Sequence, residues 1–198
     1  LRKGSKMKPD VERFWRWENE INPKLCKEII ELAEDNWSTA TTLSGVGNSY
    51  LRKGKTFFTN EQHIYDLFFP YMEIANKNAG LNFDIDRAED CQISKYDKND
   101  HYGAHIDSLG TWSTRYNYPD NQHLHNRTRK ISMTCTLNSD FEGGELELTT
   151  LAGTNGENLE ATQGTIVFFP SFLQHRVKPV TKGTRYSIVL WFIGAPWR

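Results

Sequence analysis

The sequence predicts a mainly β protein with flanking helices (α+β): a double-stranded β-helix (jelly roll) core with N-terminal helices packed on one sheet. Apolar residues recur at helical spacing before Gly80 and at alternate positions after it. Helices followed by an all-β remainder favour a β-sandwich that carries its helices on one face. We therefore expect a single domain over residues 1–198, with a helical support region at 1–80 and the jelly-roll core at 81–198.

The composition is that of a globular protein without a general affinity for polyanions. Of the 198 residues, 37% are hydrophobic and 13% are aromatic, which suffices for one real core. The formal net charge of −1 provides no electrostatic surface for nucleic acid or for a membrane. One stretch is locally basic, and we interpret it as either a solvated loop or a binding segment: Arg115, Arg127, Arg129 and Lys130.

The cysteines and the apolar runs bear on the cellular compartment. Cys26, Cys91 and Cys135 are too widely spaced for a Cys-x2-Cys zinc site, and an odd number argues against a disulfide framework. We expect three free thiols in a reducing environment. The chain has no apolar run of membrane-spanning length and no signal-peptide pattern, so a cytoplasmic location is expected. The sequence predicts no particular oligomeric state.

The first predicted helix follows Asn22. This residue is a typical N-cap, and Pro23 suits the first helical position. Apolar residues then recur at helical spacing, and the helix is expected to end near Asp35 or Asn36. Its expected role is to support a sheet. A strand is predicted next, over residues 51–58.

The second predicted helix follows that strand. Thr59 and Gln62 lie three residues apart, which predicts a capping box at its start. Pro70 lies inside the apolar pattern of this helix and should kink or divide it, because proline lacks the N–H that an interior helical position requires.

Five strands are predicted after Gly80, separated by turns that contain Gly, Asn and Pro. In the strand that begins at Ile131, alternate residues form a polar face of Ser132, Thr134 and Thr136. A polar face inside a small barrel is where a ligand would bind. The five predicted strands span residues 91–96, 131–137, 145–149, 165–169 and 184–193.

A long loop is predicted at residues 108–129. It has about twenty residues without periodicity, whereas most loops in compact domains have roughly four to six. Long loops of this kind are commonly lids or binding loops. Its aromatic residues, which include Trp112, Tyr116 and Tyr118, argue against a disordered insertion.

A metal site is predicted around His105 and Asp107. The two residues lie two positions apart, so on a strand both side chains point to one face. We take His175 as the third ligand, in a loop after the apolar run GTIVFFP. Two imidazoles and one carboxylate on one side of a metal leave the opposite positions open, which suits Fe(II) that must bind a co-substrate and O2.

An anion site is predicted at Arg185. On its strand this residue shares one face with Ser187, Val189 and Trp191, while the opposite face is apolar. A guanidinium on the inward face of a buried strand is unfavourable unless an anion meets it. A dicarboxylate co-substrate, bound bidentately, would be such an anion.

Five ordered motifs cover roughly residues 91–191, about half of the chain. They are the run from Tyr96 to Asp107, RKISMTCTLN from Arg129, FEGGELEL from Phe141, GTIVFFPS from Gly164 and HRVKPVTKGTRYSIVLW from His175. Together they resemble the prolyl 4-hydroxylase-type Fe(II)- and 2-oxoglutarate-dependent dioxygenases. By this resemblance, His105, Asp107 and His175 match the Fe(II) ligands and Arg185 matches the anchor for the distal carboxylate of 2-oxoglutarate. The remaining co-substrate contacts that the resemblance implies are Tyr96, Thr134 and Ser187.

The resemblance also implies a reaction and a substrate. O2 and 2-oxoglutarate would be consumed, succinate and CO2 released, and a proline of a peptide or protein hydroxylated, with ascorbate as reductant. The long loop would act as a lid that limits side reactions. The residues expected to contact the substrate are Tyr102, Trp112, Tyr116 and Tyr118.

The chain departs from the family pattern at two positions. Asn99 stands where the family usually has Gly, and Asn is the residue that next best tolerates positive φ. Arg185 replaces the Lys of the animal collagen-type enzymes, and resembles the bacterial-type members. Asp107 is retained, whereas the halogenating relatives have a small residue there, so the resemblance favours hydroxylation.

Three other functions would account for part of these motifs. A small-molecule or free amino-acid hydroxylase would use the same metal chemistry. A non-catalytic cupin-like metal-binding module would explain the two His and the Asp, but would leave an inward-facing Arg185 without a purpose. A zinc hydrolase is disfavoured, because no candidate acid or base lies beside the ligands in the sequence.

Overall fold

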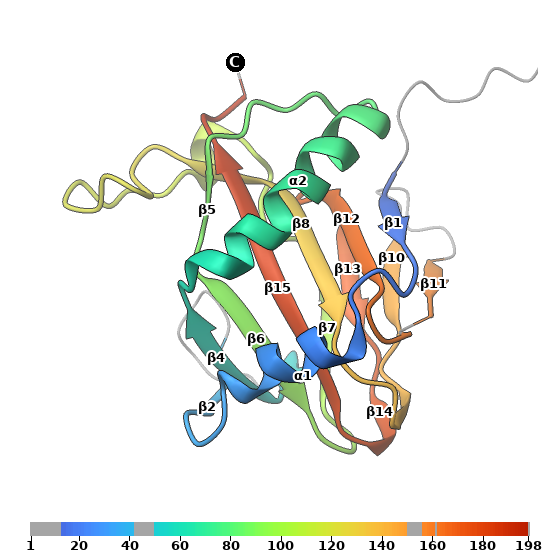
Figure 1. Ribbon diagram of the computed structural model, residues 1–198. Coiled ribbons are helices and arrows are strands. Elements are labelled where there is room, and N and C mark those ends of the chain that lie inside the picture. Colours follow the sequence, from blue (N-terminus) through green and yellow to red (C-terminus); the bar gives the residue numbers. More distant parts are fainter. Residues whose placement is uncertain (1–12, 42–49, 150–155, 161, 198) are drawn as a thin grey trace, which may run out of the picture.

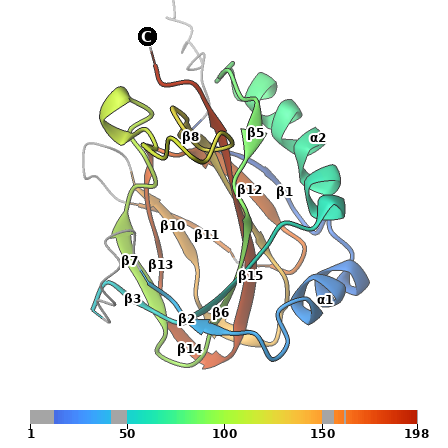
Figure 2. The same cartoon turned by 90° about the vertical axis from the view of Figure 1, so that its left-hand side faces the viewer.

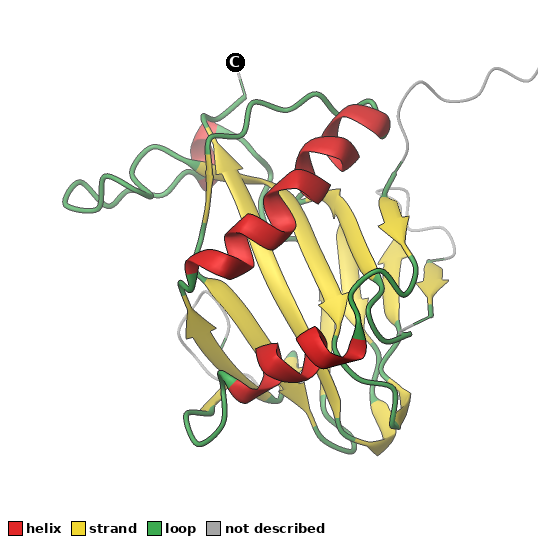
Figure 3. Ribbon diagram, viewed as in Figure 1, coloured by secondary structure: helices red, strands yellow, loops and turns green. Residues whose placement is uncertain are grey.

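The computed structural model describes residues 13–41, 50–149, 156–160 and 162–197, so the predictions for residues 1–12 lie outside the described residues. Two antiparallel sheets face each other, and both helices lie on the outer face of the larger sheet (Figures 1 and 2). Strands dominate the molecule, as the colouring by secondary structure shows (Figure 3). The predicted fold class, a mainly β core with N-terminal helices on one sheet, is confirmed.

The larger sheet is organised around two long strands, β8 and β15. Alternate residues of β15 divide between its faces: Ile188, Leu190 and Phe192 enter the core under the helices, and Ser187 and Val189 face the smaller sheet. This division confirms the predicted face pattern. In spatial order the strands are β1 (Trp15–Trp17), β12 (Ile166–Pro170), β8 (Thr128–Thr136), β15 (Arg185–Gly194), β6 (Cys91–Tyr96), β4 (Lys55–Thr59) and β2 (Ser38–Thr39), and β5 (Arg87–Ala88) pairs with β15.

The smaller sheet has its own apolar cluster against the larger one, formed by residues such as Leu148 and Phe169. Its strands, in spatial order, are β11 (Glu157–Leu159), β10 (Leu146–Thr149), β13 (Gln174–Val177), β7 (His101–His105) and β3 (Arg52–Lys53). A separate pair is formed by β14 (Val180–Gly183) and β9 (Phe141–Gly143), and a short 3-10 helix, η1, spans Trp112–Thr114.

Helix α1 (Pro23–Glu31) begins as predicted. The Asn22 side chain accepts a hydrogen bond from the Leu25 backbone N–H at 2.9 Å, and Pro23 occupies the first turn. The helix ends at Glu31 and continues as turns to Asp35, so it is shorter than predicted. Its buried residues, Cys26 and Ile29, face the larger sheet.

Helix α2 (Gln62–Asn78) differs from its prediction at its N-terminus. Its N-cap is Glu61, with no side-chain capping bond, so the predicted capping box at Thr59 was wrong. Pro70 lies inside the helix without dividing it. The buried face of α2, from Ile64 to Ala75, is fixed on the sheet by tertiary packing, which outweighs the missing backbone donor. No helix in the described part of the chain is long and apolar enough to cross a membrane.

Several short strands were not predicted. Those at Trp15–Trp17, Ser38–Thr39 and Arg87–Ala88 have two or three residues, too few for alternation to show. His175, predicted in a loop, lies on β13. Strand β8 begins at Thr128, so Arg129 and Lys130 are buried strand residues, 8% and 2% exposed, and not part of a solvated loop.

The contact between α2 and the larger sheet should dominate stability. Phe68 is fully buried in this core, whereas Phe58 on β4 is 53% exposed. We expect Phe68→Ala to lower the free energy of unfolding by about 3–5 kcal/mol, because a cavity replaces the ring. Phe58→Ala, the matched control, should change it by roughly 0.5 kcal/mol or less. Urea unfolding measures both, and equal effects would contradict this account of the core.

Candidate functional site

Two histidines meet across the smaller sheet. His105 at the end of β7 is directly opposite His175 on β13 in the antiparallel register, and their ring centroids lie 4.2 Å apart. Directly opposed residues of an antiparallel pair project to the same face, so both imidazoles enter the space between the two sheets. The sheet register therefore brings together two side chains that are seventy positions apart in the sequence.

Asp107 joins the two histidines from just beyond β7. Its carboxylate Oδ1 lies 3.8 Å from His105 Nε2, and its Oδ2 lies 3.5 Å from His175 Nε2. The backbone N–H of Asp107 donates to the Ser171 carbonyl at 2.9 Å, and the Ser132 hydroxyl donates to Oδ2 at 2.6 Å. One potential ligand atom from each of the three residues lies within 4.8 Å of the others, which is a compact donor set.

The hydrogen bonds of both imidazoles fix the tautomer that a metal requires. The Nδ1 atom of His105 lies 2.8 Å from the Gly103 carbonyl, and that of His175 lies 2.9 Å from the Leu173 carbonyl. A carbonyl only accepts, so Nδ1 carries the proton and the Nε2 lone pair faces Asp107. Burial and the neighbouring His175 lower the pKa of His105 to about 4. The neutral ligand form is therefore available at neutral pH.

The donor set fits Fe(II). Two neutral imidazoles and one carboxylate on a single side are the ligands of the facial site that leaves positions open for other groups. Burial opposes ionisation of the carboxyl, but His175, Arg129, His105 and the Ser132 hydroxyl outweigh it, so the pKa of Asp107 lies below its ordinary value. The Asp107 carboxylate is thus ionised at neutral pH, which is the form that binds a cation.

The predicted anion-binding residue, Arg185, lies on β15 of the larger sheet. Its side chain is 1% exposed; Nη1 donates to the Ser187 hydroxyl at 2.9 Å, and Nε has no partner among the described residues. In the described part of the chain no carboxylate lies within ion-pair distance of it. Burial lowers the pKa of Arg185. A buried guanidinium in this position fits the carboxylate of a bound anion.

Gly144 makes room for Arg185. It has a positive φ of +67°, and a Cβ atom there would lie 2.7 Å from Arg185 Cδ. A side chain at Gly144 of the FEGG stretch would therefore collide with Arg185. Asn99 also has a positive φ, +69°, as expected for the residue that replaces the family's Gly.

One cavity between the sheets contains most of the predicted site residues. Tyr102 stacks on His105 with ring centroids 3.7 Å apart, and Arg52 lies over the other side of Tyr102 at 4.4 Å. Trp191 lines the cavity, and its indole N–H has no partner among the described residues. The predicted residues that line this cavity are Tyr96, Tyr102, His105, Asp107, Thr134, His175 and Ser187.

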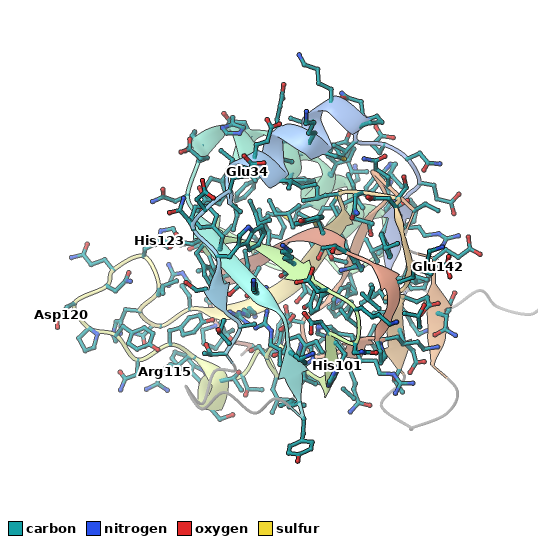
Figure 4. All side chains as sticks on the ribbon, turned by 90° about the horizontal axis from the view of Figure 1, so that it is seen from below. Glu34, His101, Arg115, Asp120, His123 and Glu142 are labelled. Carbon is teal, nitrogen blue, oxygen red and sulfur yellow. The ribbon has the colours of Figure 1, made fainter. Side chains whose placement is uncertain are left out.

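The long loop lies elsewhere. Figure 4 shows Arg115, Asp120 and His123 on a segment that projects from the body of the protein, with Asp120 at its outer end. Trp112 and Tyr118 are 54% and 55% exposed, and neither lines the cavity. Tyr116 is half-buried and donates a hydrogen bond to Glu89 at 2.6 Å. Substrate contact by these three aromatic residues stays a prediction.

Three residues of the site were not singled out from the sequence. Ser132 was recognised only as part of a polar strand face, Arg129 only as part of a basic stretch, and Glu89 not at all. Arg129 and Glu89 form a buried ion pair at 2.7 Å beside Asp107. Arg129 lies in the same motif as Ser132, and its place just before the alternating residues of β8 was the one available signal.

Solved structures share this fold. A prolyl hydroxylase from Trichoplax adhaerens, in complex with a hypoxia inducible factor peptide fragment, superimposes with a TM-score of 0.71 at 18% identity, covering 91% of this chain and 83% of that chain. A Pseudomonas putida prolyl-4-hydroxylase has a TM-score of 0.65 at 17% identity, with 91% of each chain covered. At 17–18% sequence identity, these two comparisons show a shared fold and no more.

Sequence comparison identifies relatives and the family. A PKHD-type hydroxylase of Idiomarina loihiensis is 37% identical over 102 residues, which are 50% of this chain and 39% of that protein. One of Prochlorococcus marinus is 26% identical over 182 residues, covering 85% of this chain and 71% of that protein. The first of these matches thus spans less than half of the relative's length. A sequence model of the 2OG-Fe(II) oxygenase superfamily matches residues 91–193, just over half of the chain. The chain therefore belongs to the 2OG-Fe(II) oxygenase superfamily.

Proposed function

We propose that this protein is an Fe(II)- and 2-oxoglutarate-dependent hydroxylase that acts on prolyl residues of a peptide or protein. The observation that supports it most directly is the combination of two features. His105, Asp107 and His175 form a compact metal donor set in the cavity between the sheets. Arg185, which donates to the cavity-lining Ser187, is buried without an anionic partner among the described residues. We place this activity in one domain over residues 1–198.

Each group of residues has a distinct task. His105, Asp107 and His175 bind Fe(II) on one side and leave its other positions open. When bound, the iron with 2-oxoglutarate and O2 supplies the oxidising power for hydroxylation, and succinate and CO2 are the co-products. Arg185 binds the distal carboxylate of 2-oxoglutarate, and the hydroxyl groups of Tyr96, Thr134 and Ser187 add hydrogen bonds. Ascorbate serves as reductant for the metal.

The surrounding residues exclude water. Val189, Leu146 and Phe169 line the cavity and make its walls apolar. An apolar enclosure strengthens the attraction between Arg185 and a carboxylate, because little solvent remains to screen the charges. It also limits side reactions.

The prolyl substrate is supported by the relatives and by one surface feature. Two solved structures that share this fold are prolyl hydroxylases, one of them in complex with a peptide. Trp112 and Tyr118 expose aromatic rings on the loop that follows Asp107. Exposed aromatic side chains suit an extended, proline-rich chain, which binds at a low entropic cost. A peptide would therefore contact this loop while its proline enters the cavity beside Tyr102.

The metal assignment predicts the effect of His175→Ala. Loss of one of three protein ligands should abolish 2-oxoglutarate turnover and weaken iron binding. The control is His63→Ala on α2, which removes a histidine whose side chain is 57% exposed. Anaerobic titration with Fe(II) and succinate release measure the two effects. Full turnover by the His175→Ala protein would exclude this ligand.

The anion assignment predicts the effect of Arg185→Ala. Removing one partner of a desolvated charge pair costs roughly 3–5 kcal/mol, so the dissociation constant for 2-oxoglutarate should rise by at least about a hundredfold. Arg185→Lys should bind better than the Ala variant but worse than the wild type, since it loses bidentate geometry.

The control for this experiment is Arg176→Ala, an exposed arginine on β13 that pairs with Glu147 at 2.8 Å. It should leave 2-oxoglutarate affinity unchanged. Calorimetry on the metal-loaded protein gives all four constants. Wild-type affinity in Arg185→Ala would place the anchor at another residue.

The substrate assignment predicts one added oxygen on proline. Proline-rich peptides incubated with the protein, iron, ascorbate and 2-oxoglutarate should gain one oxygen atom, located on proline by fragmentation mass spectrometry. Free amino acids, tested in parallel, should not stimulate succinate release. Succinate release driven by a free amino acid, with unmodified peptides, would refute the prolyl substrate and leave the oxygenase chemistry intact.

A further inference from the structure

A chain of short contacts runs from the long loop to the Asp107 carboxylate. The Tyr116 hydroxyl on the loop donates to Glu89 Oε1 at 2.6 Å. Arg129 donates two hydrogen bonds of 2.7 Å to the same Glu89 carboxylate, from Nε and Nη2. Its third nitrogen, Nη1, lies 3.6 Å from Asp107 Oδ1. Every donor position of the Arg129 guanidinium thus faces a carboxylate.

Three neighbours fix the orientation of Arg129. Glu89 binds one edge of the guanidinium, Asp107 faces the other edge, and the Trp191 ring lies against its face with the guanidinium carbon 3.8 Å from the ring centroid. Arg129 and Glu89 are 8% and 9% exposed, so each charge depends on the other. The Arg129 guanidinium is therefore held in one orientation beside the Asp107 carboxylate.

The Asp107 carboxylate is restrained from both sides as a result. The Ser132 hydroxyl donates to Oδ2 at 2.6 Å, and Arg129 faces Oδ1. A carboxylate restrained at both oxygens cannot rotate freely, and such outer contacts usually set the affinity of a metal ligand.

We propose that Arg129 is a positioning residue for Asp107, that Glu89 orients Arg129, and that Tyr116 couples the long loop to this arrangement. The inference rests on the proposed role of Asp107 as a metal ligand. The loop is closed at its base by backbone bonds from Tyr116 N to the Arg127 carbonyl at 2.8 Å, and from Asn126 N to the Tyr116 carbonyl at 3.0 Å. Movement of the loop is thereby transmitted to Tyr116. A substrate that engages the loop changes the environment of the metal ligand through Glu89 and Arg129.

The test is Arg129→Lys, which keeps the positive charge but loses the planar fork. Because the charge is retained, a change in metal affinity reports orientation and not the local field. With Co(II) as the probe metal, we expect the dissociation constant to rise about tenfold or more, with altered visible absorption bands of the bound ion. The melting temperature is measured in parallel.

The matched control is Arg127→Lys. Arg127 lies two residues earlier and pairs with Asp86 at 2.8 Å, on the same basic stretch but outside the contacts of Asp107. Its substitution should leave Co(II) binding and the absorption bands unchanged. A folded Arg129→Lys protein that binds Co(II) as the wild type does would overturn the proposal.

A second variant, Tyr116→Phe, tests the link to the loop and leaves the Glu89–Arg129 pair in place. We expect a smaller, severalfold loss of Co(II) affinity and faster hydrogen exchange across residues 115–127. Tyr118→Phe, on the exposed neighbour that stacks on Tyr116 at 5.8 Å, is its control. If Arg129→Lys does not fold, Tyr116→Phe becomes the decisive variant for the proposal. Co(II) affinity and hydrogen exchange equal to those of the wild type in Tyr116→Phe would refute the coupling.

A failure of the proposed metal site can be distinguished from a failure of the positioning role of Arg129. If Asp107→Ala binds Co(II) as tightly as the wild type, Asp107 is not a ligand and the metal site itself is refuted. If Asp107→Ala loses Co(II) binding while Arg129→Lys and Tyr116→Phe retain it, the metal site stands and only the positioning role is wrong.

Discussion

The need to neutralise buried charge governs the space between the two sheets. Glu89 and Arg129 satisfy each other, and Asp107 is held by Ser132 and faced by Arg129. Arg185 has no carboxylate within ion-pair distance among the described residues, although it is almost fully enclosed. A buried cation without an anionic partner is unfavourable, and a bound anion would relieve this cost. Arg129 is thus neutralised within the protein, whereas Arg185 is left to pair with an anion from outside it.

Much of this arrangement could be predicted from the sequence, because it depends on local spacing. His105 and Asp107 are two positions apart, as are Arg185 and Ser187, a spacing that predicts side chains on one side of a strand. Arg185 and Ser187 lie on β15, whereas Asp107 lies just beyond the end of β7. The strand Cys91–Tyr96 was predicted with its observed bounds. His175 was assigned from its place after the apolar run GTIVFFP, and the ordered motifs then matched it to a metal ligand. It lies on a strand of only four residues that alternation could not reveal.

The remainder depends on contacts that no local pattern contains. Glu89 and Arg129 are forty positions apart, and their ion pair exists because β5 and β8 both flank β15. Lys130 is buried, with its ammonium over the Trp197 ring at 3.2 Å, although its sequence context allowed either a solvated loop or a binding segment. The long loop could be recognised by its length, but its direction could not, since that is set by Tyr116 and the bonds at its base. Pairing across strands and the path of a loop are tertiary properties.

The direct opposition of His105 and His175 has a consequence for how such a protein diversifies. Side chains alternate along a strand, so one residue inserted into β13 would turn His175 toward the outside and dismantle the donor set. The loop after Asp107 contributes no residue to this register, because its two limbs are joined by backbone bonds at Tyr116 and Arg127. A change in its length would cost mainly loop-closure entropy, which varies slowly with length. We therefore expect insertions and deletions to be excluded from β13 and better tolerated in the loop. The geometry of the donor set depends on strand register, and the length of the loop does not.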